Sequence, residues 1–381
     1  MSETNDLPIA NALRALRQVA KLSQSDLARF ADTTRQTIGA LEAGSYAPTL
    51  AVALRLARAL GCRVDELFWL ERPWPAVVAE LVPARTPSGE PPLRVQVARV
   101  GARTIARPLD AFGVADGLVA PPAPTGAAPG PTTVRLLADP DLLDRTVLLL
   151  GCDPALATLG AHLGRRHARH GLRLLVGQSG SLAALAALAR GEAHIAGLHV
   201  LDAASGEYNL PFVRRTFAGR RVLVVTAAHW TQGLIVAPGN PRGIAGAADL
   251  ARPDLAIVNR EPGSGSRAML DHALHTAGVA PAAVRGYDRV APSHRAVAEI
   301  VAAGFADAGP GIEAAAAALG LGFIHLADER VDFVIPAEHR DTPPVQALLD
   351  TLTSPAFRAE IDALPGYDTS QTGRVVLEAL V

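Results

Sequence analysis

The hydrophobic positions follow three different patterns along the chain. Over residues 1–72 they fall three or four residues apart, as between Leu13 and Leu16, which predicts short amphipathic helices. Over residues 93–100 apolar and polar residues alternate, which predicts a β-strand with one polar face. From about residue 146, apolar runs of four to six residues lead through glycine or serine turns into helical stretches. This rhythm predicts parallel strands covered by helices.

Proline-rich segments separate these regions. Residues 73–92 contain six prolines and are predicted to form a linker, and residues 120–131, rich in proline, glycine and alanine, a surface loop. The expected organisation is an all-α domain (1–72), this linker, a short β-containing connector (93–145) and an α/β domain (146–381). The connector is expected either to transmit a signal or to support dimerisation.

The composition excludes several classes of protein. The chain has 381 residues, of which 49% are hydrophobic and 19% charged, so it can bury a sizeable core and is not globally disordered. With 36 basic and 37 acidic residues, any contact with DNA must come from a local surface. The single lysine, Lys21, excludes a phosphate-loop lysine or a Schiff-base lysine from the C-terminal region.

The number of cysteines and the absence of long apolar runs indicate the cellular compartment in which the protein is expected. Cys62 and Cys152 are too few for a disulfide framework or a cysteine zinc site. The N-terminal segment lacks the apolar core of a signal peptide, and no run of about 18 apolar residues occurs. We therefore expect a cytoplasmic protein without a membrane partner.

Residues 22–68 carry the most specific pattern in the sequence. Ser23 can cap one short helix, and Thr33 or Thr34 can cap a second that ends at Glu42. Two short helices joined so closely form a helix-turn-helix, whose second helix can enter the major groove of DNA. A helical bundle that binds another protein is the alternative, because the first 72 residues hold nine basic and eight acidic side chains.

The segments LSQSDLA, TIGALEAG and ALGCRVDELF resemble the phage-repressor-like (Cro/C1, or XRE) family of helix-turn-helix transcription regulators across residues 9–70. The resemblance implies operator DNA as the partner and a homodimer on two half-sites. The DNA-contacting residues that it implies are Gln24, Thr34, Arg35, Gln36, Thr37 and Gly39. Arginine suits guanine and glutamine suits adenine. Gly39 departs from the family, which often has a longer polar residue there.

Four glycine- or serine-rich turns precede predicted helices in the C-terminal region. They are residues 151–154, 177–181, 261–267 and 307–313. Helix N-termini carry unpaired amide hydrogens and partial positive charge, and small residues let an anion approach the backbone. Several such ends facing one cleft would form an oxyanion site without a lysine.

The segments GCDPAL, QGLIVAPGNPRGI, VNREPGSGSRAMLD and LPGYDTSQTG resemble the periplasmic-binding-protein-like domain fused to bacterial regulators and to molybdenum-cofactor biosynthesis proteins, over about residues 146–373. The resemblance implies a two-lobed, type II α/β domain. Its expected lobes are residues 146–238 plus 331–381 (lobe 1) and 239–330 (lobe 2), with crossings near 236–239 and 327–333. It further implies molybdate or tungstate as the effector between the lobes. A molybdenum-cofactor precursor, another oxyanion and a small carboxylate remain alternatives.

The turns at 178–181 and 263–267 are expected to face each other across that cleft. The candidate ligand contacts are Ser179, Gly180, Ser181, Tyr208, Asn209, Gly263, Ser264, Gly265, Ser266 and Arg267. Arg267 is the expected charge partner. Helix capping without a ligand is the alternative for each serine.

Two enzyme classes are weakly indicated. The sequence GQSGS at 177–181 lies where a hydrolase nucleophile elbow would, but that motif requires glycine in place of Ser181. Residues 263–268 fit the dinucleotide pattern G-x-G-x-x-A, which is weak on its own. We therefore expect no enzyme activity and no cofactor.

The histidines lack the spacing of a zinc motif. Those considered are His162, His167, His170, His194, His199 and His229. Without an H-E-x-x-H motif or a cysteine pair beside them, no metal site is expected.

Overall fold

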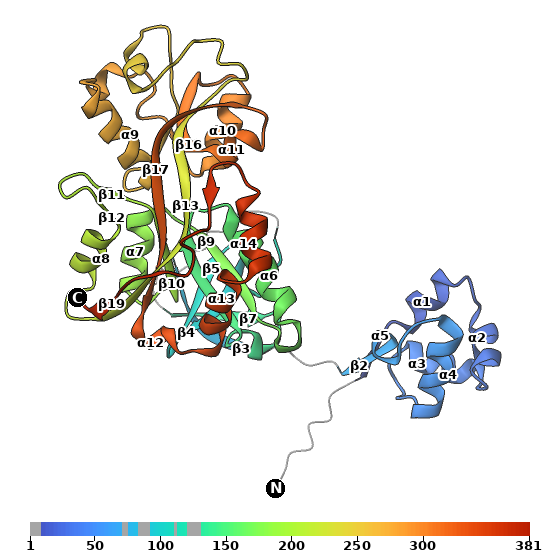
Figure 1. The fold of residues 1–381 in the computed structure, drawn as a ribbon. Coiled ribbons are helices and arrows are strands. Elements are labelled where there is room, and N and C mark those ends of the chain that lie inside the picture. Colours follow the sequence, from blue (N-terminus) through green and yellow to red (C-terminus); the bar gives the residue numbers. More distant parts are fainter. Residues whose placement is uncertain (1–8, 71–74, 83–91, 110–112, 120–130) are drawn as a thin grey trace, which may run out of the picture. The chain divides into compact units, whose positions relative to one another are not determined.

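The computed structural model describes residues 9–70, 75–82, 92–109, 113–119 and 131–381 (Figure 1). The chain forms two compact units, one ending at Pro75 and the other beginning at Ala76. No helix within the described ranges is both long and apolar enough to cross a lipid bilayer.

The N-terminal unit is helical, as predicted. Its elements are β1 (Ile9–Asn11), α1 (Leu13–Val19), α2 (Gln24–Phe30), α3 (Arg35–Glu42), α4 (Leu50–Leu60), α5 (Val64–Leu67) and β2 (Phe68–Leu70), with β1 and β2 paired antiparallel. The Ser23 hydroxyl caps α2 and the Thr34 hydroxyl caps α3, each accepting a backbone N–H at 3.1 Å. Buried Ile38 and Leu41 pack α3 into the core, so its opposite face remains polar.

The second unit begins with a small closed barrel. Its strands are β3 (Ala76–Leu81), β4 (Leu93–Val100), β5 (Arg103–Pro108), β6 (Gly117–Val119) and β7 (Pro131–Leu136), in the order β3-β5-β4-β6-β7. Strand β3 corrects the linker predicted at 73–92, because residues 76–81 pair with β7 and β5 and bury Ala79 in the barrel core. Prolines on both sides of this short strand concealed it. Of the predicted linker, the structure describes only residues 75–82 and 92. Residues 120–130 of the predicted loop lie outside the described residues.

Ion pairs join the barrel to the α/β domain. Arg173 donates two hydrogen bonds to the buried carboxylate of Asp116, at 2.6 and 2.7 Å, and a third to the Thr146 hydroxyl at 2.8 Å. Arg103 of β5 pairs with Glu80 of β3 inside the barrel and donates a hydrogen bond to the carbonyl of Gly191 in the α/β domain. The predicted connector is thus a folded part of the second unit.

The α/β domain is built around a sheet ordered β16-β13-β17-β10-β8-β9, with β18 and β19 also paired to β13. Its strands are β8 (Thr146–Gly151), β9 (Arg173–Gln178), β10 (Ile195–Leu198), β13 (Arg221–Val236), β16 (Ala308–Ile312), β17 (Gly322–Pro336), β18 (Tyr367–Asp368) and β19 (Val375–Leu380). The short pairs beside it are β11 (Leu201–Asp202) with β12 (Glu207–Tyr208), and β14 (Asn259–Arg260) with β15 (Val290–Ala291). The predicted parallel pairing holds for β8, β9 and β10.

Helices pack around this sheet in two groups (Figure 1). Those of lobe 1 are α6 (Ala155–Arg166), α7 (Ser181–Ala189), α8 (Leu210–Thr216), α12 (Ala337–Arg340), α13 (Pro343–Leu352) and α14 (Pro355–Asp362). Those of lobe 2 are α9 (Gly265–Thr276), α10 (His294–Ala302) and α11 (Glu313–Ala317). The domain therefore has the two predicted lobes.

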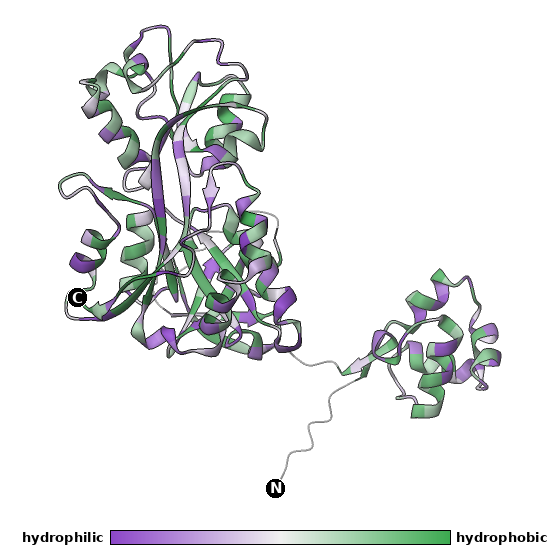
Figure 2. Cartoon of the chain, in the orientation of Figure 1, coloured by the Kyte–Doolittle hydropathy of each residue, from purple (hydrophilic) through white to green (hydrophobic). Residues whose placement is uncertain are grey.

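Two long antiparallel strands, β13 and β17, connect the lobes. In Figure 2 their colour changes from hydrophobic inside lobe 1 to hydrophilic or neutral where they pass between the lobes. The predicted first crossing, near 236–239, is corrected, because β13 already pairs with β16 of lobe 2 from Gln232 onward. The apolar sequence GLIV continues the strand and concealed the change of lobe. The second crossing, predicted at 327–333, lies on β17, which pairs with β10 of lobe 1 from Asp332 to Val334.

Candidate functional site

Buried polar side chains gather between the lobes, and we call them the interlobe cluster. Its members are Cys152, His199, Gln232, Arg260, Ser266, His294 and Glu329. Lobe 1 supplies the first two from the ends of β8 and β10, lobe 2 supplies residues from β14, α9 and α10, and the crossing strands supply the remaining two. Burying so many polar groups is unfavourable unless they are paired, so their partners reveal what the cluster can do.

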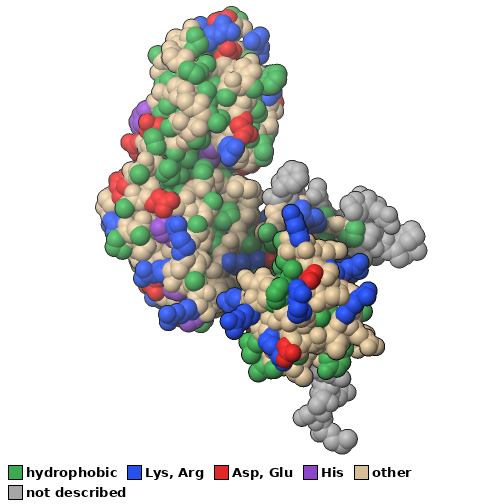
Figure 3. Space-filling view, turned by 90° about the vertical axis from the view of Figure 1, so that its right-hand side faces the viewer, with side chains coloured by type: hydrophobic (Ala, Val, Ile, Leu, Met, Phe, Trp, Pro, Cys, Tyr) green, Lys and Arg blue, Asp and Glu red, His purple; other side chains and the backbone are tan. Residues whose placement is uncertain are grey.

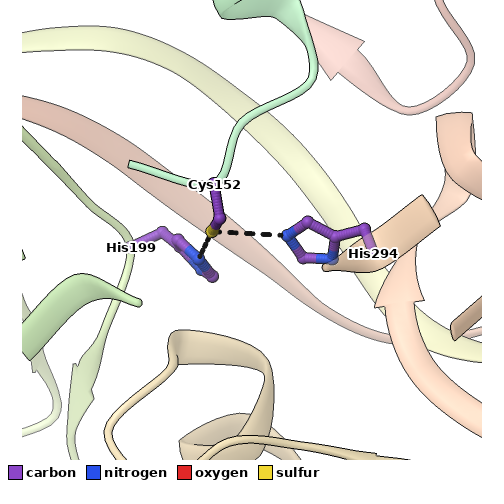
Figure 4. A group of neighbouring side chains, drawn as sticks. All are labelled: Cys152, His199 and His294. Atoms are coloured by element: carbon purple, nitrogen blue, oxygen red, sulfur yellow. Dashed lines mark hydrogen bonds between the residues drawn. The ribbon is translucent and has the colours of Figure 1, made fainter. Parts of the chain in front are cut away.

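A chain of hydrogen bonds begins at the thiol of Cys152. Its sulfur lies 3.2 Å from Nε2 of His199, whose Nδ1 lies 2.9 Å from a carboxylate oxygen of Glu329. Nε2 of His294 approaches the same sulfur at 3.7 Å from the other lobe (Figure 4). Trp230 and Gln232 donate to the same Glu329 oxygen, at 3.3 and 2.8 Å. Two imidazoles therefore converge on one sulfur.

Burial and neighbouring charge shift the pKa values in opposite directions. Burial raises the pKa of the Cys152 thiol, but the adjacent His199 outweighs it, and the net pKa is lowered. Burial lowers the pKa of His199, yet the facing thiolate and Glu329 raise it overall. Burial, with the charge of Arg260, lowers the pKa of His294 well below its usual value. The thiolate of Cys152 is thus more accessible than that of an ordinary cysteine, and His294 is favoured as a neutral imidazole with a lone pair.

Several polar atoms of the cluster are buried and have no hydrogen-bond partner in the described structure. They are Gln232 Oε1, Arg260 Nη1, Ser266 Oγ, His294 Nδ1 and Glu329 Oε1. Buried polar groups in native proteins nearly always have a partner, so such a concentration marks a place where a small ligand can supply one.

The two turns that were expected to face each other lie in direct contact. The Leu182 N–H donates to the Gly263 carbonyl at 3.2 Å. A side chain on Gly180 would lie 3.5 Å from the Cα of Ser264. Gly265 is required by packing, because a Cβ there would lie 2.1 Å from the His199 carbonyl oxygen. The two lobes are therefore closed upon each other in this structure.

The candidate serines have different roles. Ser266 Oγ is buried and has no hydrogen-bond partner among the described residues, so it is free to bind a ligand. Ser181 Oγ accepts the His199 N–H at 3.2 Å, at the start of α7. Ser264 caps α9 and donates to the Glu261 carbonyl, which corresponds to the capping alternative. Ser179 donates to the carbonyl of the next residue, not to a histidine as a hydrolase triad would require.

Arg267, Tyr208 and Asn209 lie outside the interlobe cluster. The guanidinium of Arg267, the expected charge partner, stacks on Tyr287 and bonds to Asp271 at 3.2 Å, whereas the buried guanidinium of the interlobe cluster is that of Arg260. Tyr208 instead lines a separate, largely apolar pocket of about 590 Å³. The Asn209 side chain holds backbone and carboxylate groups of lobe 1.

Most members of the cluster were missed from the sequence. The turn that contains Cys152 was noticed as glycine-rich, and His199 was set aside because no zinc motif accompanies it. The ligand atoms of Cys152, His199 and His294 nevertheless lie within 4.8 Å of one another, which the expectation of no metal site did not anticipate. Their separation in sequence carries no signal, because only the sheet and the closed lobes bring them together.

The predicted DNA-contacting residues lie on and beside α3. Arg35 and Gln36 are exposed at its start, while Thr34 and Thr37 share a hydrogen bond at 2.9 Å. Gln24 uses its amide to donate to Glu42 at 3.0 Å, which restrains it. Figure 3 shows basic side chains spread over the face of this unit turned to the viewer. The described residues 9–70 hold eight basic and five acidic side chains, so local positive charge exceeds that of the whole chain.

Comparison with known proteins agrees with the two modules. The profile of the PBP superfamily domain matches residues 162–353, and a helix-turn-helix profile matches residues 13–67. The uncharacterized protein YvgK of Bacillus subtilis is 38% identical over 232 residues, which cover 61% of this chain and 74% of YvgK. The uncharacterized HTH-type transcriptional regulator YgzD of the same species is 38% identical over 61 residues, 16% of this chain and 92% of YgzD.

Solved structures with similar folds include a phosphate-binding transporter protein from Clostridium perfringens (13% identity, 57% of this chain and 96% of that one, TM-score 0.45). Another is a tungstate transporter protein from Geobacter sulfurreducens, which is 14% identical over 56% of this chain and 95% of that one, with a TM-score of 0.42.

The fold and its two modules define a helix-turn-helix regulator joined to a periplasmic-binding-protein-like ligand-binding domain. The chain belongs to the family defined by the PBP superfamily domain. Its N-terminal unit belongs with the XRE-type helix-turn-helix regulators.

Proposed function

We propose that this protein is a one-component transcription regulator that binds operator DNA through α3 and a small oxyanion between its lobes. Molybdate and tungstate are the effectors we favour, and a homodimer is the form we expect on DNA. The observation that supports the oxyanion is that two donors on lobe 2, Arg260 Nη1 and Ser266 Oγ, are buried and find no hydrogen-bond partner in the part of the chain that the structure describes.

The environment of Arg260 suits an anion. Its side chain is fully buried, and Nε and Nη2 are held by the carboxylate of Glu261 at 2.9 and 3.0 Å. The guanidinium is therefore fixed in place, with Nη1 left to bind a further acceptor. Ser266 lies in the first turn of α9, a twelve-residue helix whose N-terminal amides favour negative charge.

Closure of the lobes explains how such a buried site is used. A ligand would enter between separated lobes and stabilise the closed arrangement seen here. A molybdenum-cofactor precursor or a small carboxylate would use the same donors, so the effector must be identified by direct competition.

Calorimetric titration of the full chain with molybdate, tungstate, sulfate, phosphate and small carboxylates tests the proposal. Ser266→Ala should weaken the binding of the selected anion by about ten- to a hundredfold, because a hydrogen bond to a charged group contributes about 1.5–3 kcal/mol. Ser264→Ala is the matched control, since it removes a helix cap and should lower stability without changing affinity.

Gel-shift titration on operator DNA, with and without the selected anion, tests the regulatory part. Absence of binding by any of these anions would overturn the oxyanion effector. Unchanged DNA affinity in the presence of a bound anion would overturn the regulatory coupling.

A further inference from the structure

We propose that Cys152, His199 and His294 form a binding site for a transition-metal ion of the zinc class, which joins the two lobes. These three residues belong to the same interlobe cluster as the donors assigned to the oxyanion, but the proposal rests on none of those donors. The three ligand atoms lie within 4.8 Å of one another, and all three side chains are buried (Figure 4).

The distances fit tetrahedral coordination. With metal–sulfur and metal–nitrogen bonds of about 2.3 and 2.0 Å, neighbouring ligand atoms of a tetrahedral site lie about 3.3–3.6 Å apart. The sulfur of Cys152 lies 3.2 Å from Nε2 of His199 and 3.7 Å from Nε2 of His294. Both sulfur–nitrogen distances are thus close to those of a tetrahedral site, and the two imidazole nitrogens, which lie within 4.8 Å of each other, would move closer together when an ion binds.

The fold explains why these residues meet. Strands β8 and β10 are parallel neighbours, with Leu150 opposite Ala196, so the chain leaves both at the same edge of the sheet. Cys152 follows the first strand and His199 the second. His294 is the first residue of α10 in lobe 2, directly after the cap Ser293. Two ligands thus come from one lobe and the third from the other.

A buried carboxylate orients His199 as in established metal sites. Ligating histidines commonly bond their second ring nitrogen to a carboxylate, which fixes the ring and directs the other nitrogen at the metal. Glu329 occupies this position at 2.9 Å from His199 Nδ1. It is fully buried and is itself held by Trp230 and Gln232, while its other oxygen has no partner.

The donor set selects the class of metal. One thiolate and two imidazoles suit Zn²⁺, Co²⁺ or copper, whereas Ca²⁺ and Mg²⁺ require oxygen ligands. Three protein ligands leave a fourth position open for water or an exogenous group.

The same hydrogen-bond chain, Cys152–His199–Glu329, would also suit a cysteine nucleophile. The second imidazole on the sulfur, and the burial of Cys152, favour the metal.

Cobalt binding tests the proposal on the full-length protein after treatment with a chelator. Titration with Co²⁺ should give one equivalent of tetrahedral d–d bands and a sulfur-to-cobalt charge-transfer band, and Zn²⁺ should displace both. Cys152→Ser should abolish the charge-transfer band. Glu329→Gln should weaken cobalt binding by about ten- to a hundredfold, and His294→Gln should weaken it further.

Matched controls separate ligation from folding and from the oxyanion proposal. Cys62→Ser and His272→Gln alter a cysteine and a histidine outside the cluster and should leave the spectrum unchanged. Ser266→Ala should lose anion affinity but keep the cobalt bands, so the two proposals can fail independently. Circular dichroism of each metal-free variant checks that it remains folded.

Three results would overturn the metal site. The first is the absence of tetrahedral cobalt bands in the wild type, and the second is retention of the charge-transfer band in Cys152→Ser. The third is rapid alkylation of Cys152 by iodoacetamide that added Zn²⁺ does not slow, which would assign the cluster to a cysteine nucleophile instead.

Discussion

The two units of this protein arrange their functional residues in opposite ways. In the N-terminal unit, the residues predicted to contact DNA, apart from Gln24 on α2, occupy α3 and its cap, and Arg35 and Gln36 are exposed neighbours. In the α/β domain, the interlobe cluster is assembled from seven elements, and Cys152 and His294 approach each other only where the two lobes meet. The first kind of site depends on local helix geometry, and the second on the packing of the whole domain.

Adding one methyl group between the lobes should have the largest effect. A Cβ at Gly265 would lie 2.1 Å from the His199 carbonyl oxygen, so Gly265→Ala must push the lobes apart. We expect a loss of about 3 kcal/mol or more in the free energy of unfolding, at the upper end for overpacked cores. Urea unfolding measures this change. A stability equal to wild type would show that the lobes are not closed in solution.

Lowering the pH should have the next largest effect, and it should destabilise the α/β domain but not the N-terminal unit. Burial, then the neighbouring His339, lowers the pKa of His194 to about 4, and its Nδ1 accepts the Leu148 N–H at 2.9 Å. Because the folded pKa lies below the unfolded value near 6.5, His194 contributes full stability above pH 6.5 and loses it as pH falls toward 4. The expected loss is about 3 kcal/mol.

His194→Asn keeps an acceptor without titrating in this range, so its stability should fall less between pH 6.5 and 4. The N-terminal unit has no histidine and should show no such dependence. Calorimetry across this range checks both statements, and identical pH profiles for variant and wild type would contradict the assignment.

Changes on α3 should affect DNA binding while leaving the other unit untouched. Arg35→Ala and Gln36→Ala each remove an exposed side chain suited to bidentate contact with a base. Each should cost about 1–3 kcal/mol of binding to operator DNA and relax discrimination at one base pair. Gel shifts on operator and scrambled DNA at fixed salt provide the measurement. Equal affinity of both variants and wild type would remove these residues from the interface.

The smallest effect should come from adding a methyl group at Gly39 of the N-terminal unit, the counterpart of the change at Gly265. The atom nearest to an added Cβ at Gly39 is the Gln24 amide nitrogen at 3.9 Å, so alanine fits there. Gly39→Ala should stabilise this unit by about 0.5–1 kcal/mol, because glycine is unfavourable inside a helix. Thermal unfolding tests the sign, and destabilisation would reveal a packing constraint on α3.

The sequence was informative wherever structure is local. Caps at Ser23 and Thr34 and the spacing of buried residues predicted α2 and α3 and their exposed face. Glycine turns likewise identified the start of α9. The positions of Arg260 and Glu329 could not be predicted in this way, since the first lies one residue before a noticed turn and the second lies inside a crossing strand. Only the register of β13 with β17 places Glu329 opposite Trp230.

Strand β8 serves two neighbours at once. One end leads directly to Cys152 in the interlobe cluster, while Leu148 near its middle shares a core with Ala98 and Ile105 of the barrel. At the other end, the Thr146 hydroxyl accepts a hydrogen bond from Arg173, which also forms an ion pair with Asp116 of the barrel. Six extended residues make a stiff rod of about 20 Å. The barrel, which comes first after the N-terminal unit along the chain, therefore rests on the strand that leads to the cluster, and a shift of β8 at Cys152 would be passed on to it.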